Sequence, residues 1–316
     1  MLLGHETAWR EWRKALSGER MHHAWLLAGR RGVGKGSFAF AAACELVGVD
    51  PADAQNHPDI LTLTYAPKDD KEERKRADGK PYEVARSIRI AQVRGMQARL
   101  GTRPTLGDKR AIIIDPADDL ERNAANALLK SLEEPPIGTY FLLVAHSPAR
   151  LLPTIRSRCR VLRFPTVSDA EMDRLLADLS LGADTATRAA AIAAAGGSPG
   201  AALQFVDMEL GKVRQAMDAI LARGDPDFQL RGTLAGLIGA RPDRERIRAV
   251  LELARSAVAQ RLDGAMADPR PVIDTHSELV RLTGEQPTYN FDAGLLAMEI
   301  GTLLAKAATA SERADG

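Results

Sequence analysis

The sequence of 316 residues has few cysteines, few aromatic side chains and almost no net charge. Its two cysteines, Cys44 and Cys159, are too few for a disulfide framework or for a four-cysteine zinc site within one chain. Aromatic residues make up 4% of the chain, which argues against a surface that stacks many bases of single-stranded nucleic acid. The net charge of +1 provides no global field toward nucleic acid or an anionic membrane. Any contact with nucleic acid must therefore come from a local patch.

Long apolar runs are also missing. No segment has the roughly 18 apolar residues of a membrane span, and the N-terminal segment MLLGHETAWREWRKAL carries charges where a secretory signal needs an uninterrupted apolar stretch. We therefore expect a soluble protein with no membrane partner, and the scarcity of cysteine favours the reducing cytoplasm. The 45% hydrophobic content is enough for a sizeable core in two or three domains.

Short, dense apolar runs alternate with amphipathic segments in the first half of the chain. Runs that are apolar on both faces suit the strands of a parallel sheet covered by helices on each side. The runs are residues 24–28, 60–63, 111–114, 140–145 and 161–164. The residues that share helical faces between them are Trp9, Trp12 and Leu16, then Val93, Met96 and Leu100, then Leu128, Leu129 and Leu132. The alternation predicts an α/β domain over residues 1–166.

The composition changes after Pro165. Ser168 is a plausible N-cap for a helix over residues 169–179, and an alanine-rich stretch over residues 185–195 ends at the glycines and proline of residues 196–200. We expect a small helical domain over residues 167–207. Helical periodicity continues almost throughout the remainder, which predicts a separate all-helical domain over residues 208–316.

A glycine-rich loop, GRRGVGKGS over residues 29–37, directly follows the first apolar run and opens a helix predicted over Ser37–Val47. In such a loop, glycines let backbone N–H groups turn toward phosphate oxygens, and a lysine neutralises the β and γ phosphates. The candidate phosphate-binding residues are Gly29, Gly32, Gly34 and Lys35.

Two parts of an ATP-hydrolysing site are replaced. Gly36 stands where a Ser or Thr hydroxyl would hold Mg²⁺, and Ser37 is one residue late, about 100° further round the helix. Asp115 follows the third apolar run and could reach a metal, but Pro116 stands where a glutamate would orient water, and Asp118 cannot be assumed to substitute. Three states of the loop stay open: hydrolysis, ATP or ADP binding without hydrolysis, and no nucleotide.

One insertion, residues 68–80, reads KDDKEERKRADGK. Because its charges are of mixed sign and no aromatic side chain is interleaved, we expect a solvated loop or charged hairpin. The alternative is a DNA-contacting finger that uses Arg74, Lys75 and Arg76.

Further strings carry a family resemblance. NALLKSLEEPP at residues 126–136 precedes the apolar run 140–145, and TIRSRC follows at residues 154–159. With the phosphate loop and the acidic run after residue 114, their order closely resembles the clamp-loader AAA+ proteins of DNA replication. The resemblance implies a RecA-like P-loop domain, a small helical lid and an all-helical oligomerisation collar. It is firm to about residue 205 and looser beyond.

Within that family, the departures resemble the delta-prime branch rather than the gamma/tau motor. Gly36 and Pro116 replace parts that the motor keeps, and residues 197–203 lack the arginine with which a motor senses nucleotide from its lid. His57-Pro58-Asp59 before a strand also resembles this branch. Many members carry a four-cysteine zinc module, but no cysteine follows Cys44 before His57, so we expect no zinc and no other metal.

The resemblance implies a role for Arg158 in the SRC motif. It would act in trans as an arginine finger on ATP bound by a neighbouring motor subunit, while a sliding clamp is loaded onto primed DNA. The implied partners are the gamma/tau ATPase subunits, the delta subunit, the clamp and, through the complex, DNA. The chain would be part of a DNA-directed DNA polymerase holoenzyme, with no required cofactor and no ATPase or polymerase activity of its own.

Alternatives remain for these residues. Arg156 or Arg158 could be an ordinary cation at a helix end. The default role of Cys159 is packing in the protein interior. The chain could instead be an autonomous motor-type AAA+ ATPase, in which Ser37 or Asp118 replaces a lost ligand. A third interpretation is a scaffold with a non-functional phosphate loop.

Overall fold

The computed structural model describes residues 5–18, 20–179, 183–263, 268–286 and 291–312. By its internal contacts the chain divides into two compact units, Met1–Thr166 and Val167–Gly316. Within the described residues, no helix is both long and apolar enough to cross a lipid bilayer.

In the first unit, five described strands form one parallel sheet in the order β2-β3-β4-β1-β5. The strands are β1 (Ala24–Ala28), β2 (Ile60–Leu63), β3 (Arg110–Ile114), β4 (Thr139–Ala145) and β5 (Arg160–Arg163). Each predicted apolar run lies within one residue of a strand, so the α/β expectation is confirmed. β2 and β5 are the edge strands, and β5 is the more exposed of the two, with only Leu162 of its four residues buried.

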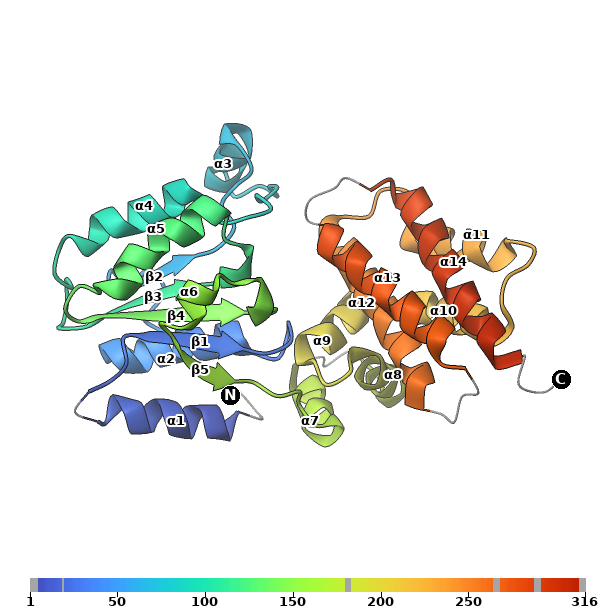
Figure 1. Ribbon diagram of the computed structural model, residues 1–316, viewed down its shortest axis with the longest axis horizontal. Helices are drawn as coiled ribbons and strands as arrows, with labels where there is room; N and C mark the ends of the chain where they lie inside the picture. The colour runs from blue at the N-terminus through green and yellow to red at the C-terminus, as the bar shows by residue number, and fades with distance from the viewer. Residues whose placement is uncertain (1–4, 19, 180–182, 264–267, 287–290, 313–316) are drawn as a thin grey trace. The chain divides into compact units, whose positions relative to one another are not determined.

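Helices cover both faces of this sheet (Figure 1). Alternate strand residues feed two cores: Ile113 and Leu142 pack with α1 and α2 on one face, whereas Ile112 and Phe141 pack with α4, α5 and α6 on the other. The helices of the first unit are α1 (Glu6–Leu16), α2 (Lys35–Val47), α3 (Asp70–Ala77), α4 (Ile90–Leu100), α5 (Arg122–Glu133) and α6 (Pro153–Arg156), with the short 3₁₀ helices η1 (Ala117–Asp119) and η2 (Pro148–Arg150). The double coverage explains why these strand runs are apolar without alternation.

The described residues of the second unit form helices joined by loops, with no strand among them (Figure 1). Its helices are α7 (Asp169–Leu179), α8 (Thr185–Ala195), α9 (Pro199–Asp207), α10 (Gly211–Arg223), α11 (Gln229–Ile238), α12 (Arg244–Gln260), η3 (Arg261–Asp263), α13 (Arg270–Glu285) and α14 (Ala293–Glu312). Ser168 and Glu171 exchange the hydrogen bonds of a capping box at the start of α7. One hydrophobic core includes residues of both α7–α9 and α10–α14, so the division at residue 207 stays a prediction.

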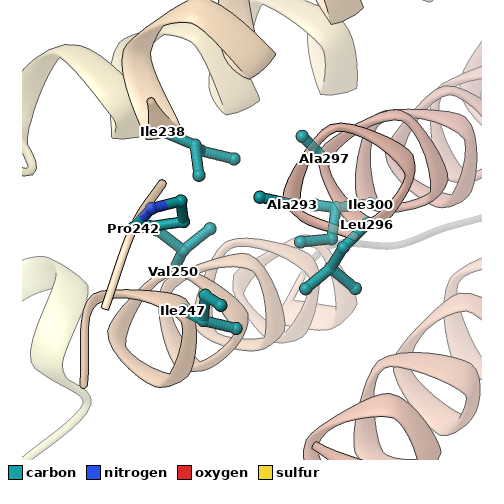
Figure 2. A pocket seen from close by; sticks show the side chains of 8 residues that line it. All are labelled: Ile238, Pro242, Ile247, Val250, Ala293, Leu296, Ala297 and Ile300. Atoms are coloured by element: carbon teal, nitrogen blue, oxygen red, sulfur yellow. The ribbon is translucent and has the colours of Figure 1, made fainter. Parts of the chain in front are cut away.

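An apolar pocket lies among α11, α12 and α14 (Figure 2). Aliphatic side chains and one proline point into it, and its lining consists of Ile238, Pro242, Ile247, Val250, Ala293, Leu296, Ala297 and Ile300. It belongs to the helical core of the second unit rather than to the phosphate loop.

Candidate functional site

The predicted phosphate loop begins at the carboxyl end of β1. Gly29 follows the strand, and Gly34, the N-cap residue of α2, has a φ of 97°, a backbone region that a side chain would strain. α2 begins at Lys35, two residues before the predicted start at Ser37, because Lys35 and Gly36 already form its first turn. Loop and helix N-terminus thus have the arrangement of a phosphate-binding motif.

Lys35 is buried, with an exposed fraction of 2%. Its Nζ donates hydrogen bonds to the carbonyl oxygens of Gly29 at 2.8 Å and Arg30 at 2.6 Å, so the ammonium group lies inside the loop that it would serve. Burial lowers the pKa of Lys35 to about 8, although the carboxylates of Asp115 and Asp118 act to raise it. Lys35 can therefore carry its positive charge near neutral pH, although removing that charge from water costs free energy.

Gly36 and Asp115 approach each other closely. A Cβ atom at Gly36 would lie 2.6 Å from Oδ2 of Asp115, so the carboxylate occupies the space that a side chain would need. Burial raises the pKa of Asp115, whereas the charges of Lys35 and Arg31 act to lower it. Position 36 therefore offers no hydroxyl to a magnesium ion, and the Asp115 carboxylate takes up the space beside it.

The two candidate replacement ligands, Asp118 and Ser37, differ in their surroundings. Both carboxylate oxygens of Asp118 accept the backbone N–H of His146, and Oδ2 also accepts that of Ser147 at 2.7 Å. Asp118 is buried and joins η1 to the end of β4. Ser37 is on the exposed side of α2, as its position in the helix predicts.

Arg158 lies between α6 and β5. Its side chain is 34% exposed, one guanidinium nitrogen pairs with Oε1 of Glu133 at 2.6 Å, and the other donates to the carbonyl oxygen of Thr154 at 2.9 Å. The side chain thus acts as a helix-end cation in the isolated chain, which is the ordinary role that the sequence left open. Burial raises the pKa of Cys159 to about 12, so this thiol is not poised for nucleophilic chemistry.

Arg158 and the phosphate loop lie at opposite ends of two neighbouring parallel strands, Arg158 before the amino end of β5 and the loop after the carboxyl end of β1. β5 pairs with β1 so that Arg160, the first residue of β5, is level with Trp25, and Arg158 lies in the turn that precedes this end of β5. Gly29 follows the other end of β1, four residues beyond Trp25 and roughly 13 Å away at the rise of a strand, and Arg158 precedes Arg160 in the opposite direction. Arg158 therefore cannot reach a phosphate held by its own loop.

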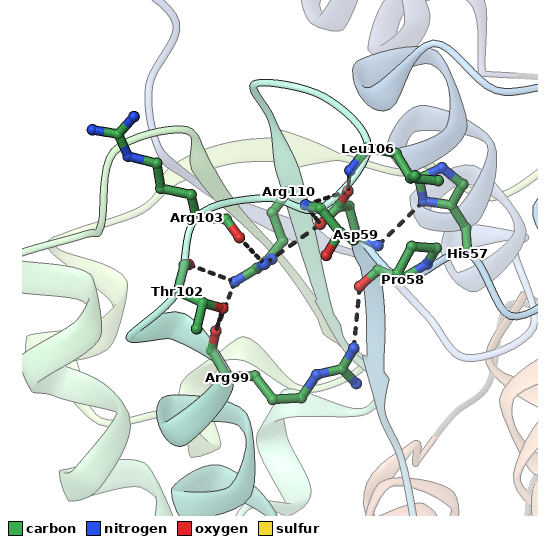
Figure 3. A network of polar contacts seen from close by, with 9 residues as sticks. His57, Pro58, Asp59, Arg99, Thr102, Arg103, Leu106 and Arg110 are labelled. Carbon is green, nitrogen blue, oxygen red and sulfur yellow. Dashed lines mark hydrogen bonds and ion pairs between the residues drawn. The ribbon is translucent and has the colours of Figure 1, made fainter.

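The His57-Pro58-Asp59 segment supports a buried polar network at the amino edge of the sheet (Figure 3). Asp59 is fully buried and accepts the backbone N–H groups of Thr105 at 2.7 Å and Leu106 at 2.8 Å. Burial acts to raise its pKa, but these donors and the guanidinium of Arg110 hold the pKa below its usual value. His57 accepts the backbone N–H of Asp59 through Nδ1 at 3.2 Å.

Arg110 completes this network. It is 3% exposed, pairs with Asp59 at 3.4 Å, and donates to the carbonyl oxygens of Arg99, Thr102 and Arg103. The motif that resembles the delta-prime branch therefore holds the connection between α4 and β3 in place and is far from the phosphate loop.

The charged insertion is a helix rather than a loop or hairpin. Asp69 caps α3 by accepting the backbone N–H of Glu72, and the Asp-x-x-Glu spacing is the sequence signal that could have predicted this helix. Glu72 is buried, pairs with Lys75 and accepts the backbone N–H of Glu83. Arg76 pairs with Glu73. Two of the three cations proposed for a DNA-contacting finger are thus neutralised by acids of the same helix.

Metal-ligand clusters are not formed by the described residues, in which no three His, Cys, Asp or Glu side chains come together. Cys44 is buried on α2, where burial raises its thiol pKa. The expectation that this chain needs no zinc stays a prediction.

Sequence reasoning missed the partner of Arg158. Glu133 is the last residue of α5, where a helix dipole disfavours an acid. That unfavourable position, just before Pro135 and Pro136, was the signal that a cation should lie nearby.

Comparison with known proteins supports the same family. A family model described as DNA polymerase III, delta subunit, matches residues 4–168. The DNA polymerase III subunit delta' of Pseudomonas aeruginosa is 36% identical over 167 residues, which are 47% of this chain and 46% of that protein. Subunit delta' of Escherichia coli (strain K12) is 30% identical over 233 residues, 69% of this chain and 64% of that protein. The matches thus span about half to two thirds of these relatives.

Among solved structures, a DNA polymerase III gamma subunit-related protein from Thermotoga maritima MSB8 matches with a TM-score of 0.51 at 16% identity, covering 95% of this chain and 99% of that one. At this identity the likeness concerns the fold alone. The family model covers more than half of the sequence. The chain therefore belongs to the DNA polymerase III delta-subunit family of clamp-loader AAA+ proteins, and the resemblance to its delta-prime branch is confirmed.

Proposed function

We propose that this chain acts as a delta-prime subunit of a DNA polymerase III clamp loader and supplies Arg158 to ATP bound by a neighbouring gamma/tau subunit. The observation that carries the proposal is the position of Arg158 before the amino end of β5, whereas the chain's own phosphate loop follows the carboxyl end of the neighbouring strand β1. Because the side chain cannot serve its own site, a phosphate that it contacts must belong to another subunit.

The chemistry of the guanidinium suits this role. Hydrolysis develops charge on the phosphoryl oxygens, and a planar, permanently charged group in a dry interface stabilises that charge. Arginine fingers contribute about 10³- to 10⁵-fold to the rate in well-studied phosphoryl-transfer enzymes.

The chain's own loop is suited at most to holding ATP or ADP. Backbone N–H groups at the start of α2 and the ammonium group of Lys35 would contact the phosphates, provided that Lys35 leaves the carbonyl oxygens of Gly29 and Arg30. Gly36 and Pro116 supply neither a metal-binding hydroxyl nor a carboxylate that would orient water. A motor-type role is disfavoured because Asp118 is committed to backbone donors.

The remaining partners follow from the same assignment. The helices of the second unit would join the oligomeric collar with the gamma/tau and delta subunits, and the assembled complex would carry the clamp to primed DNA. A net charge of +1 is compatible with a subunit whose contacts are mostly with proteins.

The test is ATP hydrolysis by the isolated chain and by the reassembled complex. We expect no turnover by the isolated chain with saturating ATP and Mg²⁺, and a loss of clamp- and DNA-stimulated ATPase when the complex contains Arg158→Ala. Arg156→Ala is the matched control, since Arg156 is exposed and two residues away. Isolated-chain turnover that disappears in Lys35→Ala would favour the autonomous motor, and a fully active Arg158→Ala complex would contradict the finger.

A further inference from the structure

The contacts of Arg158 occupy the groups with which it would bind a phosphate. One guanidinium nitrogen lies 2.6 Å from the Glu133 carboxylate, and the other donates to the Thr154 carbonyl oxygen. A guanidinium binds carboxylate and phosphate through the same fork of N–H donors. Glu133 and a phosphate therefore compete for one side of Arg158.

The ion pair of Arg158 and Glu133 is partly exposed to solvent, as expected for a contact that can be exchanged. The Glu133 side chain is 48% exposed and that of Arg158 is 34% exposed, so water screens their attraction. The buried pair of Arg110 and Asp59, whose side chains are 4% and 1% exposed, shows what a permanent structural pair looks like in this fold. By comparison, the Glu133–Arg158 pair can open without burying an unpaired charge.

Within the described part of the chain, the pair with Arg158 is the side-chain contact recorded for Glu133. Glu133 is the last helical residue, and its charge is unfavourable at the negative end of the helix dipole. The burial of Leu128 and Leu132 holds the helix against the sheet without it. An acid at this position is compensated by Arg158, and the compensation is lost when Arg158 moves away.

We propose that Glu133 is a displaceable latch that holds Arg158 against α6 until the phosphate of a neighbouring subunit's nucleotide replaces the carboxylate. This inference rests on the proposed function of Arg158. Glu133 is a positioning residue: it contacts no phosphate, and it sets how readily the finger is released. Removal of its charge should therefore ease the capture of ATP by the adjoining site rather than weaken the chemical step.

The latch can be tested first on the isolated full-length chain. Phenylglyoxal modification of Arg158, followed by mass spectrometry of its peptide, should be about three- to fivefold faster in Glu133→Gln than in the unmodified sequence, the effect of losing a partly exposed ion pair. Glu134→Gln is the matched control, because it removes the same charge from the adjacent exposed residue. Arg156 provides an internal reference within the same protein. An unchanged rate at Arg158 in Glu133→Gln would overturn the latch.

The regulatory consequence is tested in the reassembled complex. Glu133→Gln should lower the KM for ATP about three- to fivefold, with no fall in kcat, whereas Glu134→Gln should leave KM unchanged. A fall in kcat would instead make Glu133 a support of the active finger and overturn the latch. The two proposals fail differently. An unchanged rate of phenylglyoxal modification at Arg158 in Glu133→Gln would contradict the latch alone. A fully active Arg158→Ala complex would contradict the arginine finger and, with it, the regulatory role of Glu133.

Discussion

At the scale of single residues, two side chains fill the space within and beside the phosphate loop. Lys35 bonds the loop carbonyl oxygens, and Asp115 fills the space beside Gly36. Glycine at position 36 therefore does two things: it lacks the metal-binding hydroxyl, and it leaves space for the Asp115 carboxylate. The sequence identified every member of this cluster, but only the structure shows that the carboxylate and the glycine are matched.

This match predicts a strong coupling between the two positions. Gly36→Ala should lower the free energy of unfolding by about 1 kcal/mol, because the Asp115 carboxylate, 2.6 Å from the new Cβ, must turn away from it. In an Asp115→Ala background the same change should cost nothing or should stabilise α2. Urea unfolding of the four proteins measures the coupling, and equal costs of Gly36→Ala in both backgrounds would contradict it.

The lowered pKa of Lys35 gives a pH-dependent prediction. The pKa of Lys35 is about 8 in the folded chain and 10.5 in the unfolded chain. Between these two pH values, the unfolded chain binds a proton at Lys35 that the folded chain lacks. The free energy of unfolding should therefore rise across this pH window, by up to about 3 kcal/mol, relative to Lys35→Met. Urea unfolding of both proteins through this window is the measurement. If the free energy of unfolding changed with pH in the same way in both proteins, Lys35 would not be desolvated.

At the scale of elements, the sheet was the most predictable part and the long-range polar pairs were the least. The apolar runs identified the strands because burial on both faces leaves a continuous signal. The partnership of Asp59 with Arg110 spans 51 residues and depends on how β2 and β3 pair, which no local pattern encodes. The α3 helix was missed although Asp69 and Glu72 have capping spacing, because its mixed charges suggested a solvated loop.

The buried pair at the amino edge should be essential to the α4–β3 connection. Asp59→Asn should lower the free energy of unfolding by about 3–5 kcal/mol, since it leaves the Arg110 guanidinium buried without a counter-charge. Asp53→Asn is a control at an exposed position of the preceding segment and should change stability by less than about 0.5 kcal/mol. Similar urea midpoints for both variants would contradict a structural role for Asp59.

At the scale of the whole molecule, the near-zero net charge agrees with a subunit that works through other proteins. The basic residues of α3 do not form an isolated cationic patch, because Lys75 and Arg76 pair with Glu72 and Glu73. The chain combines a phosphate loop that lacks the hydroxyl and the glutamate of a hydrolytic site with an arginine before the opposite end of the neighbouring strand. This combination agrees with the proposal that Arg158 acts on a nucleotide bound by a neighbouring subunit.

The most direct test of this account is the rate of ATP cleavage at the adjoining site, measured by rapid quench in the reassembled, clamp- and DNA-bound complex. With Arg158→Ala, the fraction of ATP bound at that site should leave the fast phase and hydrolyse about 10³-fold or more slowly, while the other sites keep their rate. Arg156→Ala should preserve the full fast phase. A fast phase of unchanged rate and amplitude in the Arg158→Ala complex would contradict the account.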